Sequence, residues 1–379
     1  MRRIPNTPRQ NWQAEVEKWG LIYHTFEGKP YWNESAYYTV SPAEVTTLED
    51  ATRELSRICL EAVDVVIREQ CWADFAITPE VGEIIASEWD KDPPAIYGRY
   101  DLAFDGIQPP KLLEFNADTP TALLEAAVVQ WQWLESEFKG ADQFNSIWEA
   151  LIAKWKALVE EGLMPGNTVH FGHEDSWEDL LTVTVLRDTA QQAGLRTMNI
   201  HMAEIGWDGF KQEFVDLQNR PILTLFKLYP WEWLLHDEFG QNALKSLSKT
   251  QWIEPIWKMI LSNKALLPLL WRLYPNHPNL LPAYLDGPRD MTAYVKKPLL
   301  SREGANVTVV EGGVVEETGG EYGEEGHVYQ QLFRLPNFDG KHPVIGSWVV
   351  DFEPCGIGIR ESDGLVTTDL ASFVPHLIA

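Results

Sequence analysis

The sequence predicts a fold that mixes α/β and α+β architecture, and two regions carry this prediction. In the middle third, an apolar run at residues 167–171 (NTVHF) precedes a helical stretch that Ser176 can cap, and a second strand pattern follows at residues 195–200. This strand–helix–strand order is typical of α/β proteins. Before it, residues 95–104 and 111–116 form two strand patterns joined by a turn and a longer loop, which indicates an antiparallel hairpin.

A long core helix is predicted over residues 42–69. Ser41 and Glu44 have the spacing of a capping box. Pro42 stands at the first helical position, where a backbone N–H would have no partner within the helix, so proline costs no hydrogen bond there. Apolar side chains then recur at helical spacing at Leu55, Ile58, Cys59, Ala62, Val65 and Val66. An apolar stripe of this kind packs against the protein core.

Turn and cap signals predict the elements that follow. The turn at Asp105-Gly106 joins the two strands of the hairpin. Pro120 is expected to open a helix that runs to about residue 139, and a further helix is expected over residues 145–161. The helix of the middle third should end just before Gly194.

The last third alternates helix and strand patterns around one unusual stretch. A helix is expected over residues 252–274, and strands are expected over residues 291–297, 328–333, 344–352 and 356–360. Residues 303–326 contain seven glycines and seven glutamates. Because glycine frees the backbone and glutamate prefers water, we expect a mobile β-hairpin with a loose tip there.

The composition favours a soluble protein with several lobes. A chain of 379 residues is too long for one small core, and 45% hydrophobic residues with 17 tryptophans exclude overall disorder. The formal net charge of −25 disfavours nucleic acid and anionic membranes as partners and favours cations such as metal ions or polyamines. Solubility alone is the simpler explanation of this charge.

The location expected from the sequence is the cytoplasm. The three cysteines, Cys59, Cys71 and Cys355, have no spacing that suits zinc or a disulfide framework, which favours reduced thiols. The basic N-terminus lacks the apolar stretch of a signal peptide, and no run of about 18 apolar residues exists. No pattern indicates an oligomeric state.

Polar side chains concentrate on the predicted hairpin. Arg99 and Asp101 share one face of the first strand, and Glu114 and Asn116 share one face of the second, because strand side chains alternate. If the strands pair there, three oxygen donors suited to Mg²⁺ converge beside a guanidinium suited to carboxylate or phosphate. The alternative is a pair of solvated faces, which the apolar residues between them argue against.

Two helix starts carry further candidate binding residues. Thr119 and Thr121 stand where the helix after the hairpin is expected to begin, and hydroxyls with free N–H groups favour an anion such as a substrate carboxylate. Glu178 and Asp179 lie in the first turn of the helix that Ser176 caps, where they could face a cationic amine. At both places an ordinary helix cap or helix-dipole contact is the alternative.

A nucleotide-phosphate site is predicted in the last third, which holds Lys264, Lys296, Lys297 and Arg302. Lys297 ends a predicted strand just before the glycine-rich stretch, and a lysine beside a flexible flap suits a nucleotide. Neither GxxxxGK[ST] nor a convincing GxGxxG is present, so ATP would not be held by a P-loop or a Rossmann turn. The motifs GxSxG and HExxH are also absent, and no protein nucleophile is indicated.

Six motifs follow one another along the chain: RYD from Arg99, LLEFNADTPT from Leu112, SNKALLPLLW from Ser262, YVKKPLLSREGANV from Tyr294, VYQQLF from Val328 and GIGIR from Gly356. Their order and spacing resemble the synthetase domain of the glutathionylspermidine synthase family, which includes trypanothione synthetase. The resemblance runs from about Arg99 to the C-terminus and is weaker before it. The amidase domain of bifunctional members is expected to be missing, because few residues precede Arg99.

The resemblance implies an ATP-grasp fold with a preceding pre-ATP-grasp α/β portion, in which ATP lies between two α+β lobes under a flexible lid. Three interleaved portions are expected. Residues 1–94 would form an N-terminal helical part, residues 95–220 a substrate- and metal-binding α/β part, and residues 221–379 an ATP-grasp part whose lid spans residues 302–326.

The resemblance also implies roles for the candidate residues. Mg²⁺ would be held by Asp101, Glu114 and Asn116. ATP would be contacted by Lys264, Lys297, Arg302, Glu303, Gly304, Gln330, Gln331, Leu332 and Phe333. Arg99 and Arg360 would act in catalysis by stabilising charge on the transferred phosphate and acyl group, and Arg99 would also contact substrate. The substrate pockets would use Thr119 and Thr121 for an acidic peptide and Glu178 and Asp179 for a polyamine.

The implied activity is that of an ATP-dependent carboxylate–amine ligase, in which an acyl phosphate forms and an amine then attacks it. ATP and Mg²⁺ are the implied cofactors, and a peptide-like carboxylate such as glutathione and an amine such as spermidine are the implied substrates. This chain departs from the family pattern at Thr119 and Thr121 (serines), Asp179 (glutamate) and Glu303 (cysteine), and its tail from Val366 has few acids. Another carboxylate and amine, an ATP-binding protein without ligase activity, and a phosphotransferase therefore stay open as alternatives.

Overall fold

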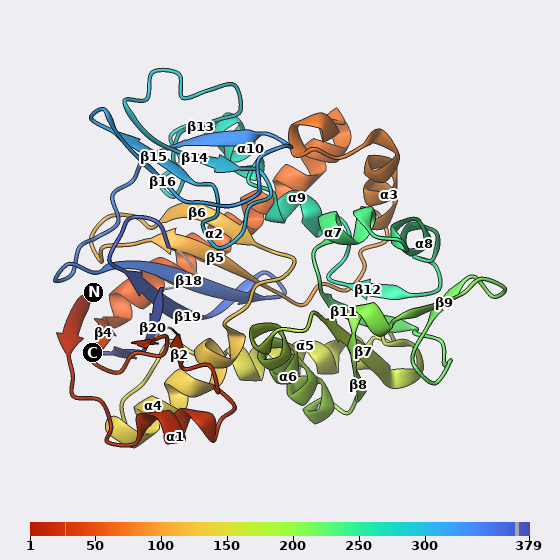
Figure 1. The fold of residues 1–379 in the computed structure, drawn as a ribbon, viewed down its shortest axis with the longest axis horizontal. Coiled ribbons are helices and arrows are strands. Elements are labelled where there is room, and N and C mark those ends of the chain that lie inside the picture. The colour runs from red at the N-terminus through yellow and green to blue at the C-terminus, as the bar shows by residue number, and fades with distance from the viewer. Residues whose placement is uncertain (27, 368–370) are drawn as a thin grey trace.

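A five-stranded antiparallel sheet forms the centre of the fold in a computed structural model that describes residues 1–26, 28–367 and 371–379. Its strands come from two distant parts of the chain (Figure 1). They are β5 (Tyr97–Ala103), β6 (Lys111–Asn116), β18 (His342–Val350), β19 (Glu353–Ser362) and β20 (Ser372–Val374), in the order β20-β19-β18-β5-β6. The expected second and third portions of the chain therefore share one sheet.

Helix α2 (Pro42–Glu69) has the predicted bounds and runs behind the central sheet (Figure 1). Both bonds of the capping box are present, since Ser41 Oγ accepts from Glu44 N at 3.3 Å and Glu44 Oε2 accepts from Ser41 N at 2.7 Å. The predicted apolar stripe is buried against the sheet, and Thr52 bonds Ser347 of β18 at 2.7 Å between their hydroxyl oxygens. The amphipathic pattern and the cap together explain this element.

We expect Ser41→Ala to lower the free energy of unfolding by about 1 kcal/mol, because the backbone N–H of Glu44 at the helix start loses its acceptor, Ser41 Oγ. Urea denaturation followed by circular dichroism would measure the change. Thr47→Ala is the matched control. Thr47 is exposed in the same helix, and its change should stay within about 0.5 kcal/mol of the parent chain. Equal losses in the two variants would contradict this account of the cap.

A four-stranded parallel sheet confirms the predicted strand–helix–strand region. Its strands are β7 (Thr168–His173), β8 (Arg196–His201), β11 (Thr224–Leu228) and β12 (Gln251–Ile253), in the order β12-β11-β7-β8. Helices α5 (Ile147–Glu160) and α6 (Trp177–Gln192) pack beside it, and Ser176 caps α6 as expected. The side chain of Ser176 accepts a hydrogen bond from Asp179 N at 3.1 Å.

The prediction of one continuous helix over residues 252–274 is wrong at its start and in its middle. Residues 251–253 instead form β12, which pairs in parallel with β11, because Trp252 and Ile253 pack into the core on either side of the sheet. Pro255 disfavours helix before it. The helical part divides at Asn263, whose side chain bonds Phe75 O and Ala265 N, into α9 (Lys258–Ser262) and α10 (Leu266–Leu273).

A second five-stranded antiparallel sheet contains the glycine-rich stretch. Its strands are β13 (Ala283–Tyr284), β14 (Ala293–Pro298), β15 (Thr308–Glu311), β16 (Val314–Glu317) and β17 (His327–Gln331), in the order β13-β17-β14-β15-β16. The predicted hairpin within residues 303–326 is confirmed as β15 and β16, which pair antiparallel. This sheet lies above the central sheet in Figure 1, with α10 beside it.

The helix expected to begin at Pro120 starts three residues later. Ala122 has a left-handed backbone with φ of 65°, and a π-helix (Glu125–Val129) then leads into α4 (Gln130–Glu137). The carbonyls that would start the helix have other partners. Tyr97 Oη donates to Pro120 O at 2.9 Å and Arg99 donates to Thr121 O at 2.8 Å.

The remaining elements complete the two ends of the molecule. β1 (Arg2–Pro5) and β21 (His376–Ile378) both pair with β4 (Ala36–Val40), which brings the chain termini close together (Figure 1). Short strand pairs are formed by β2 (Thr25–Phe26) with β3 (Lys29–Pro30) and by β9 (Gly206–Asp208) with β10 (Glu213–Val215). The other helices are α1 (Trp12–Glu17), α3 (Pro79–Trp89), α7 (Trp231–His236) and α8 (Gly240–Lys245). Over the described residues, every helix is too short or too polar to cross a membrane.

Candidate active site

One cavity of about 610 Å³ is lined by all but one of the residues that the sequence predicted for the site. The cavity takes its walls from both five-stranded sheets, from the carboxyl end of the parallel sheet and from the glycine-rich stretch. The predicted residues lining it are Arg99, Asp101, Glu114, Asn116, Thr119, Thr121, Glu178, Asp179, Lys264, Lys297, Arg302, Glu303, Gly304, Gln330, Gln331, Leu332, Phe333 and Arg360. Lys296, which precedes Lys297 on β14, does not line it.

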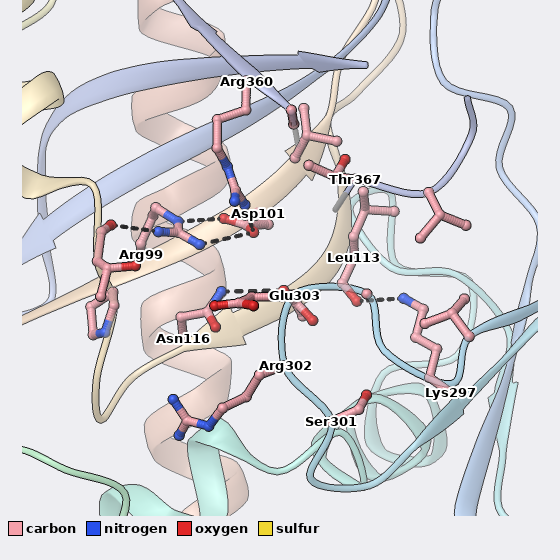
Figure 2. A pocket seen from close by; sticks show the side chains of 18 of the residues that line it. Arg99, Asp101, Leu113, Asn116, Lys297, Ser301, Arg302, Glu303, Arg360 and Thr367 are labelled. Atoms are coloured by element: carbon pink, nitrogen blue, oxygen red, sulfur yellow. Dashed lines mark hydrogen bonds and ion pairs between the residues drawn. The ribbon is translucent and has the colours of Figure 1, made fainter. Parts of the chain in front are cut away.

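Asp101 is the centre of the charged cluster. In the hairpin, Asp101 lies opposite Glu114 and Arg99 lies opposite Asn116, so the two strands do pair at these residues, which is the condition that the sequence argument set. Arg99 donates to both carboxylate oxygens of Asp101, at 2.7 and 3.2 Å, and Arg360 of β19 donates to Oδ2 at 3.1 Å. Figure 2 shows the two guanidiniums reaching this carboxylate from two strands. Asp101 is only 4% exposed, so it holds both arginines in a largely water-free place.

Glu114 and two lysines form the neighbouring part of the cluster. Lys264 Nζ lies 3.3 Å from Glu114 Oε2, and Lys297 Nζ donates to Gln330 Oε1 at 2.8 Å and to Leu113 O at 3.0 Å (Figure 2). Burial opposes ionisation of Glu114, but the two lysine charges outweigh it and bring the pKa of this carboxyl to about 2. Burial lowers the pKa of Lys297 to about 8, against the attraction of Glu114.

We expect the affinity for ATP to fall as the pH rises from 7.5 to 9.5, since Lys297 loses its charge near pH 8 and a neutral amine attracts phosphate weakly. Isothermal titration calorimetry at saturating Mg²⁺ would measure this. Lys297→Arg keeps its charge over the whole range and should show a much flatter dependence. A parallel loss of affinity in both proteins would contradict a role for Lys297 in the pH dependence.

The donor set at Asp101, Glu114 and Asn116 fits Mg²⁺ that is shared with phosphate oxygens. Asn116 Nδ2 donates to Glu114 Oε1 at 3.4 Å, and Asp101 lies opposite Glu114 in the hairpin, so the three side chains come from adjacent positions of the sheet. In the described chain, no three His, Cys, Asp or Glu side chains gather closely enough to hold a metal ion by themselves. Two carboxylates and one amide suit a hard cation that keeps several waters and takes further ligands from a nucleotide.

The start of the glycine-rich stretch closes one side of the cavity. Arg302 donates to Thr119 Oγ1 at 2.8 Å, pairs with Glu232 at 3.3 Å and lies 5.3 Å above the Trp233 ring. The next residue but one, Gly304, has a left-handed backbone with φ of 69°, and a Cβ there would come within 2.8 Å of Thr367 O. Glycine is therefore required where this segment meets the C-terminal loop.

Acidic and aromatic side chains line the part of the cavity at the start of α6, which we call its acidic end. Glu178 and Asp179 lie in the first turn of α6, as predicted, and burial followed by repulsion from Glu178 raises the pKa of Asp179 to about 6. Glu174 also lines this end, and Trp177 stays 59% exposed at its edge. An acidic pocket with an exposed aromatic ring suits an organic cation.

Sequence reasoning also missed a fourth acid, which lies behind this end. Glu125, on the π-helix, is 1% exposed and accepts hydrogen bonds from Tyr23 at 2.7 Å and from Tyr31 at 2.8 Å. Both tyrosines line the cavity, as does Phe26 of the same N-terminal segment. Because these hydroxyls donate to Glu125, their oxygen lone pairs remain to accept from a bound group. No local pattern could have revealed this contact, since about 100 residues separate its partners.

The helix expected to begin at Pro120 does not begin within residues 118–121, so Thr119 and Thr121 do not stand at a helix N-terminus, and their contact with an anion stays a prediction. No helix begins there, and Asp118 is 1% exposed with its carboxylate bonded to Lys227 Nζ at 2.6 Å and Trp231 N at 3.0 Å. Thr119 and Thr121 do line the cavity, but on an extended segment. Of the expected departures from the family pattern, the tail from Val366 lies partly outside the described residues.

The comparisons with known proteins agree on one family. The family model of the glutathionylspermidine synthase pre-ATP-grasp region matches residues 3–379. An uncharacterised acid–amine ligase of Haemophilus influenzae is 42% identical, with 99% of both chains covered. Trypanothione synthetase of Crithidia fasciculata is 29% identical over 77% of this chain, and the bifunctional glutathionylspermidine synthetase/amidase of Escherichia coli is 27% identical over 90% of it. The matched regions span 49% and 59% of those two relatives.

A solved structure supports the fold. A glutathione synthetase-like effector from Globodera pallida superposes with a TM-score of 0.60 over 99% of both chains, at 9% identity. At that identity the likeness concerns the fold alone, and it confirms the expected mixed α/β fold of the ATP-grasp type. The match of nearly the whole chain to one family model, together with a relative of 42% identity, settles the classification. The chain belongs to the glutathionylspermidine synthase family of acid–amine ligases.

Proposed function

We propose that this chain uses ATP to activate a carboxylate as an acyl phosphate and then joins it to an amine. The observation that carries the proposal is the arrangement of charged side chains in the cavity. Two arginines converge on Asp101, two lysines lie beside Glu114, and acidic and aromatic side chains line the acidic end of the same cavity. A phosphorylated acid is stabilised by positively charged side chains and a cationic amine by negatively charged ones. The two sites must also lie close enough for the amine to reach the acid.

The nucleotide end is assigned to the sheet of β14 and β17. Lys264 and Lys297 would neutralise phosphate charge, and Asp101, Glu114 and Asn116 would hold Mg²⁺, which would draw electrons from the transferred phosphoryl group. Gln330, Gln331, Leu332 and Phe333, with Arg302, Glu303 and Gly304, would enclose the rest of ATP. The residues 302–326 would act as a lid that keeps water from the activated acid.

The acid would lie between Arg99 and Arg360, whose guanidiniums already face one carboxylate, that of Asp101. A substrate carboxylate beside them would be held for attack on the γ-phosphate, and the charge that grows during transfer would be stabilised. Thr119 and Thr121 would add hydroxyl contacts to its peptide-like part. ADP leaves at this step, and the acyl phosphate remains with a good leaving group.

The amine would occupy the acidic end. Glu178 and Asp179 would attract an ammonium group, while the lone pairs of Tyr23 and Tyr31 would accept its hydrogen bonds. The amine attacks the acyl carbon, phosphate departs, and the proton lost by nitrogen leaves with solvent or a nearby carboxylate. Glutathione and spermidine are the substrates we propose first, because the name of the Escherichia coli relative contains them. Threonines in place of serines, and Asp179 in place of a glutamate, make another peptide and amine the next substrates to test.

The test is Mg²⁺-dependent ADP release, measured with each acid alone, each amine alone and all pairs from a panel of small peptides and polyamines. We expect release that requires an acid, rises with an amine and yields equal amounts of ADP and amide by mass spectrometry. ADP without amide would favour a phosphotransferase. ATP binding without turnover across the panel would favour a nucleotide-binding protein, and the absence of ATP binding would overturn the proposal.

A further inference from the structure

A buried ion pair lies directly beneath the cavity wall that carries Thr119 and Thr121. Asp118 lies two residues after β6, the second strand of the hairpin, and Lys227 belongs to β11 of the parallel sheet. Their side chains are 1% and 0% exposed, and Lys227 Nζ lies 2.6 Å from Asp118 Oδ1. The second carboxylate oxygen accepts from Trp231 N at 3.0 Å, and the Lys227 ammonium lies 4.8 Å from the Trp231 ring. A pair so fully withdrawn from water is costly unless each member is well bonded.

Each residue from Ala117 to Thr121 has a hydrogen bond to another part of the chain. Ser262 Oγ accepts from Ala117 N at 3.2 Å and from Asp118 N at 2.9 Å. Thr119 Oγ1 accepts from Arg302, Pro120 O accepts from Tyr97 Oη, and Thr121 O accepts from Arg99. Immediately afterwards Ala122 adopts a left-handed backbone, which is unfavourable for a residue other than glycine and persists only where the surroundings impose it.

We infer that Asp118 and Lys227 are a positioning pair that fixes residues 118–121 in the cavity wall. The expected change in KM for the acid rests on the proposed function, whereas the fixed position of residues 118–121 does not. Neither residue lines the cavity, so neither touches a substrate. The pair ties the wall to the parallel sheet, which also carries the acidic end of the cavity. It therefore sets the distance between the groups that would hold the acid and those that would hold the amine.

The chain offers a matched control in a second buried ion pair. Glu254 and Lys258 are 0% and 2% exposed and joined by a short ion pair. Glu254 accepts from the backbone N–H groups of Ile96 and Tyr97, and Lys258 donates to Tyr97 O at 2.7 Å. This pair resembles the first in burial and charge but bonds no backbone group within residues 117–121.

The experiment compares the double variants D118N/K227M and E254Q/K258M, each of which replaces a buried pair by a neutral one of similar size. We expect both to lower the thermal midpoint. Only D118N/K227M should raise KM for the acid by about tenfold or more, with the affinity for ATP unchanged, because small displacements of substrate contacts are costly. Only D118N/K227M should also speed hydrogen exchange at the amides of Ala117 and Asp118 by about tenfold or more, since their bonds to Ser262 would open.

Two further results decide the inference. If D118N/K227M fails to fold, Ser262→Ala is the substitute variant. It removes the acceptor of the same two amides and leaves both side chains of the ion pair in place. It should shift the exchange rates and the KM for the acid in the same direction. Equal exchange rates and equal KM values in the two double variants would overturn the inference while leaving the proposed function intact. If the parent protein turns over no acid at all, the proposed function fails, and hydrogen exchange still decides whether the pair fixes this segment.

Discussion

Asp101→Asn is expected to lower the rate of ADP release by more than about 100-fold, the loss typical of removing a preorganised charge from an active site. Asparagine has nearly the same shape as aspartate but no charge. Arg99 and Arg360 would then face each other without the carboxylate that both contact, at distances of 2.7 to 3.2 Å in the parent chain. The substitution also removes one of the two carboxylates proposed for Mg²⁺. Steady-state ADP release over a range of Mg²⁺ concentrations would measure the effect.

The control for Asp101→Asn is Asp363→Asn. The Asp363 side chain is 80% exposed and pairs with Lys341 at the surface, so its loss should leave ADP release within about twofold of the parent. Thermal unfolding of both variants separates a catalytic loss from unfolding. An Asp101→Asn protein that is folded and retains more than a tenth of the parent rate would contradict the central role given to this carboxylate.

Gly346→Ala is expected to reduce acid-dependent ADP release by roughly 10- to 100-fold, because displacing a positioned group by less than an ångström has effects of that size. Gly346 lies opposite Asp101 on β18. The stem of Arg99 crosses it so closely that a Cβ at residue 346 would lie 2.8 Å from Cδ and 3.4 Å from Nε of Arg99. The added methyl group must push the guanidinium away from Asp101. Single-turnover measurements would separate slower phosphoryl transfer from weaker ATP binding.

Gly358→Ala is the matched control for Gly346→Ala. Gly358 lies beside Gly346 on β19, and a Cβ there would come within 2.8 Å of the Phe373 ring instead of an arginine. Both substitutions crowd the same sheet, so both should lower the thermal midpoint by a similar amount. Only Gly346→Ala should also slow acid-dependent ADP release. An equal loss of activity in both variants would show that crowding of the sheet, and not displacement of Arg99, causes the effect.

Local patterns in the sequence were sufficient for several elements. The bounds of the helix at Pro42–Glu69 and of the strand at Lys111–Asn116 match their predictions, because caps, apolar periodicity and turns act over a few residues. The antiparallel hairpin that carries Arg99 and Asn116 was also predicted from local signals, whereas its register came from the structure. Gathering the remaining site residues into one cavity followed from the resemblance of six motifs, and their individual roles stay predictions.

Other features depended on contacts between distant parts of the chain. The segment at residues 251–253 reads as helical, yet it is a strand because β11 offers it a partner and both of its faces are buried. Residues 119–121 read as a helix start, yet the neighbouring Asp118 is bonded to Lys227, which is 109 residues away. Tyr23 and Tyr31 carry no signal of a site until the fold brings Glu125 to them.

The sequence by itself determined the class of fold, the helices and hairpins with strong local signals, and the set of charged residues that face one cavity. The tertiary structure alone decided how these charges are paired, which residues complete the acidic end, and where the helix after the hairpin starts. The physical reason is the cost of burying charge. A buried charge such as that of Asp118 or Asp101 is tolerated only when the fold supplies its partners, and those partners are set by topology and not by neighbouring residues.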